Sequence, residues 1–202
     1  MVDGKFYKMG LVLLLSINLG SNYAQDTGFQ WGVQAGINQS ILVGETFGVE
    51  ALQTEYRTGF QAALSFRMVY QGPIWWGMTG FFTNWASARV FQGVDATFRQ
   101  QEYGIRIPVG VNFRNKFFWS IAPVALVLTE GTARADINGL PFEEPFRFLR
   151  KGDLGLYSDL AYEWESGWGI QIGAYHSLIN LSEVIPLQLR QFRWELGVRK
   201  WF

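Results

Sequence analysis

The last sixteen residues of the chain, 187–202, restrict its fold more narrowly than any other stretch. They read LQLRQFRWELGVRKWF, in which every second residue from Phe192 to Val198 is apolar and the residues between are Arg, Glu and Gly. Successive side chains of a β-strand point to opposite faces, so this period of two predicts a strand with one apolar and one charged face. The strand ends on an aromatic pair, Trp201 and Phe202. It therefore needs an apolar environment on one side and a polar one on the other.

The same alternation recurs along the rest of the chain. We predict seven further strands, at residues 29–40, 56–68, 74–84, 99–113, 117–128, 153–164 and 168–178. The third and fifth of these are apolar on both faces, so the pattern leaves their orientation open, although Trp76, Met78 and Phe82 are expected to face outward. Pro108 interrupts the fourth strand and requires a bulge or an edge position there, because proline cannot donate to the ladder.

The connections between these strands alternate in length. Residues 41–55, 85–98 and 129–152 form long polar connections, whereas residues 70–73, 114–116 and 165–167 form tight ones. Long and short connections in alternation, with an even number of strands, are typical of an outer-membrane barrel. A soluble lipocalin-like barrel would instead place the apolar face inside. Aromatic residues at the strand ends favour the membrane interpretation, since they form a girdle at the interfaces.

Composition excludes several other classes of protein. The chain has 202 residues and no cysteine, so disulfides and thiolate metal sites are excluded. Seventeen basic and seventeen acidic residues balance, which gives no electrostatic reason to expect nucleic acid as a partner. The glycines lie on strands or in turns and form no phosphate-binding loop, and no metal-ligand cluster is present. We therefore expect no cofactor.

The N-terminus has the organisation of a secretory signal. Lys5 and Lys8 precede an apolar run at 10–19, which small and polar residues follow. That run is too short to span a bilayer as a helix. We predict cleavage after Ala24, with residues 1–24 as signal peptide and 25–202 as the barrel domain, while a retained N-terminal anchor is the alternative.

The polar faces of the predicted strands carry balanced charge. Six cations and six anions would line the interior, namely Arg57, Arg67, Arg106, Arg114, Arg193, Arg199, Glu102, Asp153, Asp159, Glu163, Glu165 and Glu195. An eight-stranded barrel is only wide enough for its own side chains, and buried charges must pair. We predict a plugged lumen with a structural charge network, centred on Arg57, Glu102, Arg106, Asp159, Glu163, Arg193, Glu195 and Arg199. A narrow transporter that uses the same charges is a further alternative.

An enzymatic function would have to depend on the one histidine. His176 precedes Ser177 on a predicted strand, and outer-membrane lipid-modifying or hydrolytic enzymes generally use a His with a Ser or a carboxylate. Adjacent strand residues point to opposite faces, which argues against a dyad. We predict that His176 faces the lipid or the interface, that Ser177 faces the lumen, and that the protein is not an enzyme.

The third long connection is unusually apolar. Phe142, Phe146 and Phe148 lie in it, close to a turn at residues 137–141. These side chains either fold back over the barrel mouth or into the lipid, or they form a docking surface for a partner protein.

Several segments taken together resemble a known family. The opening WGVQAGINQS, the strand IRIPVGVNFR, the block GDLGLYSDLAYEWESGWGIQIGAYHSLINLS and the terminal WELGVRKWF are similar to the PorT-type outer-membrane β-barrel family. The resemblance covers the mature chain in order, although the family tends to a Gly-Leu-Thr-Asn-Ile-like run where this chain has residues 177–181. It implies an eight-stranded barrel in the outer membrane of a Gram-negative cell. It also implies an association with a secretion route for surface proteins, and no catalytic residues.

The sequence thus predicts an all-β, eight-stranded antiparallel up-and-down transmembrane β-barrel with an N-terminal signal peptide. Its expected partners are the outer-membrane lipid bilayer and other proteins of an outer-membrane complex. The expected role is that of a structural or accessory component of a secretion or uptake assembly. By similarity to other outer-membrane barrels, Trp201 and Phe202 are expected to belong to the signal that the assembly machinery reads.

Overall fold

The computed structural model describes a barrel formed by one closed sheet. The described residues are 28–46, 49–53, 55–69, 73–91, 94–113, 116–129, 131–137, 140–146, 151–182 and 187–202. The predicted signal peptide, residues 1–24, lies outside them. No helix in this part of the chain is long and apolar enough to span a membrane.

The described residues form twelve strand segments. These are β1 (Gly28–Thr46), β2 (Val49–Gln53), β3 (Glu55–Val69), β4 (Ile74–Phe91), β5 (Val94–Arg106), β6 (Val109–Phe113), β7 (Phe117–Leu128), β8 (Gly131–Ile137), β9 (Leu140–Phe146), β10 (Gly152–Glu163), β11 (Trp168–Ser177) and β12 (Leu187–Trp201). β5 and β6 together act as one wall strand, because both pair with β4 and β7. β2, β8 and β9 lie outside the wall, which leaves eight wall strands.

The wall closes between the first and the last strand. Each wall strand pairs antiparallel with its neighbour in the chain, and β12 pairs with β1 from Gly32↔Trp201 to Thr46↔Leu187. The eight-stranded antiparallel barrel predicted from the sequence is therefore confirmed. Closure leaves no free edge in the wall, which removes the unpaired backbone groups that an open sheet would expose.

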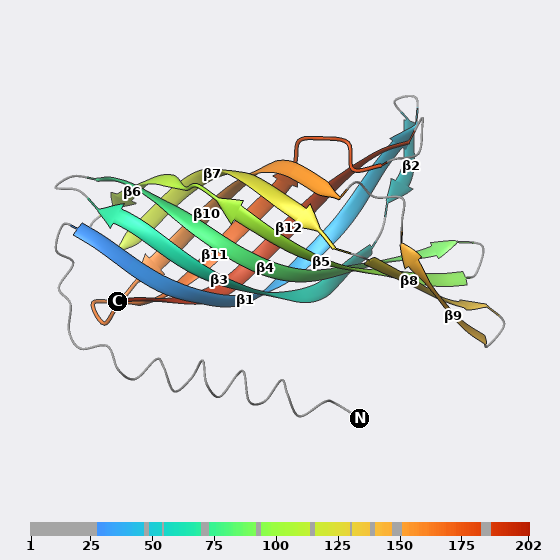
Figure 1. Cartoon of the computed structure of the whole chain (residues 1–202), viewed down its shortest axis with the longest axis horizontal. Helices are drawn as coiled ribbons and strands as arrows, with labels where there is room; N and C mark the ends of the chain where they lie inside the picture. The colour runs from blue at the N-terminus through green and yellow to red at the C-terminus, as the bar shows by residue number, and fades with distance from the viewer. Residues whose placement is uncertain are drawn as a thin grey trace.

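The two ends of the barrel differ in structure (Figure 1). One end, here called the terminal end, holds Gly28, Phe202 and the tight connections after β3, β6 and β10. The opposite, distal end carries β2, which pairs with the end of β1, and the β8–β9 hairpin, which pairs with the extended part of β5.

The long connections predicted from the sequence are partly strands. Residues 41–46 continue β1, residues 85–91 continue β4, and β8 with β9 occupies much of 129–152. β8 pairs with the extended part of β5, and β2 pairs with β1. The backbone N–H and C=O groups of these segments are hydrogen bonded in this way. Their sequences lack the alternation of apolar and polar residues that identified the wall strands.

Pro108 interrupts one wall strand without changing its register. Thr79↔Arg106 and Trp76↔Val109 belong to one continuous pairing on either side of the break. The carbonyl of Pro108 still accepts from the Gly77 N–H at 2.9 Å. On the other side the Ile107 N–H donates to the Pro123 carbonyl at 3.3 Å, so the wall accommodates the proline in register, with no bulge.

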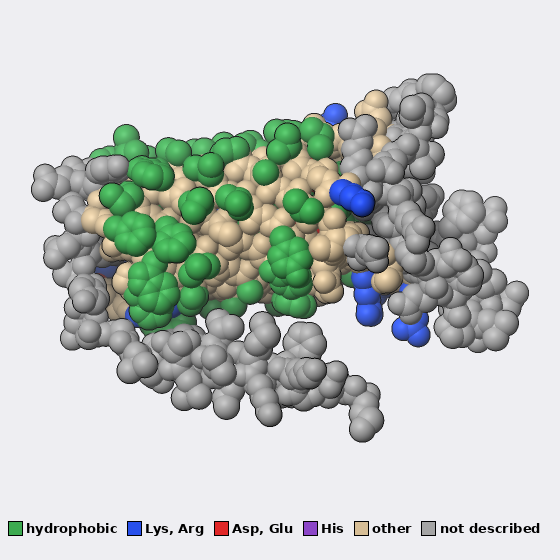
Figure 2. Space-filling model, in the orientation of Figure 1, with side chains coloured by type: hydrophobic (Ala, Val, Ile, Leu, Met, Phe, Trp, Pro, Cys, Tyr) green, Lys and Arg blue, Asp and Glu red, His purple; other side chains and the backbone are tan. Residues whose placement is uncertain are grey.

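The outer wall is apolar along its length. Large hydrophobic side chains are exposed on it, such as Ile37, Trp119 and Leu196, the last with 55% of its surface accessible. Figure 2 shows hydrophobic side chains, in green, along the face of the barrel that it presents. Trp76 and Met78 face outward as predicted. β7 alternates exposed and buried residues throughout, which defines the orientation that its sequence left open.

Candidate functional site: the filled lumen

Alternate residues of the wall strands fill the interior in three layers. Aromatic side chains occupy the terminal end, charged and polar side chains the middle, and an apolar cluster the distal end. Every second side chain of a strand points into the barrel. Because such residues on neighbouring strands lie side by side, the inward side chains form layers across the lumen.

The distal layer is an apolar core inside the barrel. Its largest fully buried members include Trp85, Leu42, Leu181 and Leu189. Leu181 joins it after β11 ends, and its N–H donates to the Leu189 carbonyl at 2.8 Å. The sequence pattern did not identify this layer, because Trp85 and Leu42 lie in segments expected to be loops.

The middle layer contains a chain of alternating charges. Nη1 of Arg193 lies 2.6 Å from Oε2 of Glu102, and Nε of Arg193 lies 3.0 Å from Oε1 of Glu195. Nη1 of Arg106 lies 3.5 Å from the other oxygen of Glu195. Two cations and two anions therefore alternate, which offsets the cost of removing each from water. The Trp85 indole N–H also donates to Glu102.

A second charge group lies nearer the terminal end. Arg67 donates to both oxygens of Glu163, at 2.7 and 2.8 Å, in the bidentate geometry that arginine favours with carboxylates. Nη2 of Arg199 lies 2.7 Å from Oε1 of Glu163 and forms an ion pair with it, without the geometry of a hydrogen bond. Nη1 of Arg199 lies 3.6 Å from Oδ2 of Asp159. The sequence predicted the residues but not these pairings.

Neutral polar side chains extend the hydrogen-bond network from Arg106. The Gln34 amide donates to the Ser65 hydroxyl at 2.8 Å and accepts from Arg106 at 2.7 Å. The Ser65 hydroxyl in turn hydrogen bonds to Thr79 at 2.9 Å. A cavity of about 20 Å³ lies among these residues, bordered by Tyr157 and Arg106. That volume holds about one water molecule, so this part of the lumen is filled.

An aromatic layer closes the terminal end. The guanidinium carbon of Arg67 lies 4.1 Å from the ring centre of Trp201 and 4.6 Å from that of Phe118. Trp75 packs edge-on against Phe118, with 6.3 Å between ring centres. Trp201 thus points into the barrel, whereas Phe202 lies outside and stacks on Trp31 at 4.3 Å.

Of the eight residues predicted to form the charge network, the structure brings seven together in the lumen. Arg57 is the exception, since its side chain is exposed near a register shift between Arg57 and Phe60. Glu165, predicted to be lumenal, is exposed in a turn beside Lys116. Arg114 lies outside the described residues. Neither Arg57 nor Glu165 therefore joins the buried network. Arg57 lies opposite the buried Ser40 but is exposed at the distal end of β3, and Glu165 lies in a turn beyond the end of β10.

The apolar residues of the third connection are only partly described. The backbone of Phe142 and Phe146 belongs to β9, while their side chains and the whole of Phe148 lie outside the described part of the chain.

His176 and Ser177 lie on opposite sides of the wall, as parity predicts. His176 is exposed on the outside, 6.2 Å from the ring of Phe192. Ser177 is fully buried and donates to Asp153 at 2.7 Å. The two residues therefore do not form a catalytic dyad. Among the described residues, no group of three or more His, Cys, Asp or Glu could hold a metal ion.

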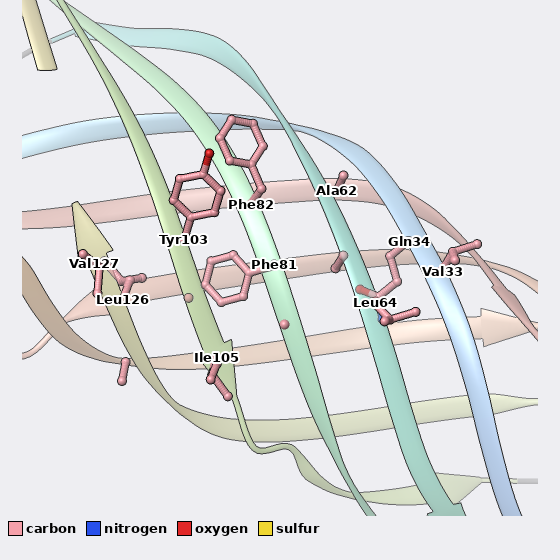
Figure 3. A pocket seen from close by; sticks show the side chains of 14 residues that line it. Val33, Gln34, Ala62, Leu64, Phe81, Phe82, Tyr103, Ile105, Leu126 and Val127 are labelled. Atoms are coloured by element: carbon pink, nitrogen blue, oxygen red, sulfur yellow. The ribbon is translucent and has the colours of Figure 1, made fainter. Parts of the chain in front are cut away.

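The outer wall also has a shallow hollow across β1, β3, β4, β5 and β7 (Figure 3). Its volume is about 820 Å³, and Leu64, Phe82, Tyr103 and Ile105 stand around Gly80, whose lack of a side chain deepens it. Apart from Gln34 and the Tyr103 hydroxyl, its lining side chains are apolar. It therefore lacks the convergent polar groups of a catalytic pocket.

Comparisons with known proteins identify a shared fold. No protein-family model matches the sequence, and no curated protein matches it either. Among solved structures, the attachment invasion locus protein Ail of Yersinia pestis superposes with a TM-score of 0.51 at 17% identity, over 88% of this chain and all of that one. Neisserial surface protein A superposes with a TM-score of 0.51 at 13% identity, over 84% of this chain and 96% of that one. These likenesses show that the chain has the fold of small outer-membrane barrels.

Proposed function

We propose that this chain is an integral outer-membrane protein with a plugged, charge-paired lumen, and that it acts as a structural or accessory component of a secretion or uptake assembly. The observation that carries the proposal is the inversion of an ordinary soluble fold: the outside is apolar, and the charged side chains are inside. Burying such a wall in hydrocarbon removes an apolar surface that water would disfavour.

The orientation follows from the positions of the termini. An even number of wall strands places Gly28 and Phe202 at the terminal end, which we assign to the periplasm with the three tight turns. The distal end, with β2 and the β8–β9 hairpin, then faces the outside of the cell. Residues 1–24 would direct secretion and be removed after Ala24.

The three filled layers support a barrel without a conducting pore. The middle layer has little free volume, and aromatic and apolar side chains close it on both sides. The narrow transporter therefore ranks below the plugged barrel. Single-channel recording in planar lipid bilayers tests this, with a reconstituted porin as positive control. We expect no conductance above background, and reproducible conductance steps from the purified protein would overturn the plugged lumen.

The accessory role is proposed from the distal extension and from the PorT-type resemblance, which stays a prediction because no family model matches the chain. A partner would meet the protein at β8 and β9, near the predicted loop residues Phe142, Phe146 and Phe148.

Site-specific photocrosslinking in cells tests this role. A crosslinker at Arg134, which is exposed on β8, should give a discrete protein adduct, whereas one at the wall residue Leu196 should give none. Equal adducts, or none at Arg134, would count against a partner at this hairpin.

A further inference from the structure

A recess in the outer wall lies at the distal end, where neighbouring strands end at different heights. His176 pairs with Phe192 in the last pair between β11 and β12. β12 extends further, through Arg190 and Gln188, which pair only with β1 on the other side. After β11 the chain turns inward, and Leu181 and Ser182 are buried. The outer side of β12 is consequently left uncovered beyond His176.

Polar side chains surround this recess, here called the His176 recess. It has a volume of about 300 Å³ and is bordered by Val43, His176, Gln188, Arg190 and Phe192, together with the inward-facing Gln191. Val43 pairs with Arg190 across β1 and β12, so both lie on the outer face. Phe192 and Val43 supply an apolar floor, while His176, Gln188 and Arg190 supply hydrogen-bond donors.

The recess lies at the limit of the apolar wall. From Arg190 toward the terminal end, the outward residues of β12 are Phe192, Trp194, Leu196 and Val198, all of them apolar. Exposed cations stand at the distal end of other strands as well, including Arg57, Arg99 and Lys151. Figure 2 shows blue side chains at this edge of the green band. In a membrane this height corresponds to the lipid headgroups.

Arg190 is an unpaired cation as far as the described residues show. Among the carboxylates whose side chains the structure describes, none forms an ion pair with it, in contrast to Arg193 in the lumen. A guanidinium at a headgroup level gains most from a bidentate contact with phosphate oxygens. An imidazole and an amide beside it add donors to the same anion.

We propose that the His176 recess binds the phosphate group of an anionic lipid of the outer leaflet. Arg190 holds the phosphate, His176 and Gln188 donate further hydrogen bonds, and an acyl chain of the lipid packs on Phe192 and Val43. The occupant is a lipid because the donors adjoin an apolar floor that continues into the lipid-facing wall. The site depends on the outer-membrane placement and is independent of the plugged lumen.

Native mass spectrometry of the purified barrel in a non-ionic detergent tests the site. The probes are diphosphorylated lipid A, zwitterionic phosphatidylcholine, and glucosamine 1-phosphate, which carries the phosphate without acyl chains. We expect lipid A to be retained at one molecule per barrel, with weaker retention of phosphatidylcholine. Glucosamine 1-phosphate should bind far more weakly than lipid A, because it cannot use the apolar floor.

Variants assign the binding to the recess. Arg190→Gln should lower the apparent affinity for lipid A about tenfold, which is about 1.4 kcal/mol. Arg99→Gln is the matched control, because it removes an equally exposed cation at the same end but outside the recess. It should change the affinity less than twofold. Heat-modifiable migration on gels verifies that each variant is folded.

Any of these results would overturn the proposal: equal binding by Arg190→Gln and the unchanged protein, an equal loss in Arg99→Gln, or equal retention of lipid A and phosphatidylcholine. The second would indicate a diffuse basic belt. Glucosamine 1-phosphate binding as tightly as lipid A would overturn the lipid as occupant. None of these results bears on conductance, so the plugged lumen is tested separately.

Discussion

Nη1 of Arg193 lies 2.6 Å from Oε2 of Glu102, although 91 residues separate the two in the chain. Arg193 also contacts Glu195 at 3.0 Å, and its side chain is 1% exposed. One guanidinium therefore bridges two buried carboxylates in the middle of the barrel, and Arg106 supplies the second cation. The stability of the lumen depends on this cation.

Removing that cation should destabilise the barrel strongly. Arg193→Met leaves Glu102 and Glu195 with one cation fewer, at a cost of about 3 to 5 kcal/mol, which is typical when one partner of a buried ion pair is lost. The measurement is reversible urea unfolding of the barrel in lipid vesicles. The double variant Arg193→Met/Glu102→Gln should recover part of the loss, and the exposed Arg57→Gln should be almost neutral. A single variant as stable as the unchanged protein would contradict the network.

The seam that closes the barrel should not tolerate a side chain at Gly36. Gly36 lies opposite Gly197 in the β1–β12 pairing, and a Cβ at Gly36 would overlap the backbone oxygen of Leu196. Gly36→Ala should lower the unfolding free energy by about 1 to 3 kcal/mol, as overpacking does. Gly80→Ala is the control, since a Cβ there meets nothing within 4 Å. It should be neutral or stabilise by less than about 1 kcal/mol. Equal effects in the same vesicle unfolding assay would contradict the close approach at the seam.

The two terminal residues should separate stability from assembly. Trp201 packs on Arg67 inside the barrel, so Trp201→Ala should destabilise the refolded protein by about 3 to 5 kcal/mol. Phe202 stacks on Trp31 outside, a contact of about 0.5 to 1.5 kcal/mol. Deleting Phe202 alone should therefore leave the refolded barrel stable and reduce its amount in the outer membrane of cells, measured by heat-modifiable migration. Normal amounts after this deletion would contradict an assembly signal at Phe202.

The structure distinguishes the two residues of the expected assembly signal. Trp201 is 7% exposed and covers the terminal end of the lumen. Deleting both residues therefore removes a packed side chain as well as a possible signal, and only the single deletion of Phe202 separates the two effects.

The sequence by itself determined the wall of this protein. A strand between hydrocarbon and a polar interior alternates strictly, so the faces of β12 and of most other wall strands could be assigned from every second residue. Opposite directions for His176 and Ser177 followed from the same rule. The rule did not identify Arg57 and Glu165 as exposed, because alternation does not show where a strand leaves the filled part of the lumen.

Only the tertiary structure decided what meets inside the barrel. The alternation of residues in a strand predicts whether a side chain points inward or outward, but it does not predict which residues meet across the lumen. Those contacts depend on the register of all eight wall strands and on their tilt relative to the barrel axis. The pairing of Arg193 with Glu102, the inward turn of residues 178–182 and the apolar layer around Trp85 all arise in this way. The His176 recess has the same origin, because it exists only where β11 ends before its neighbour β12.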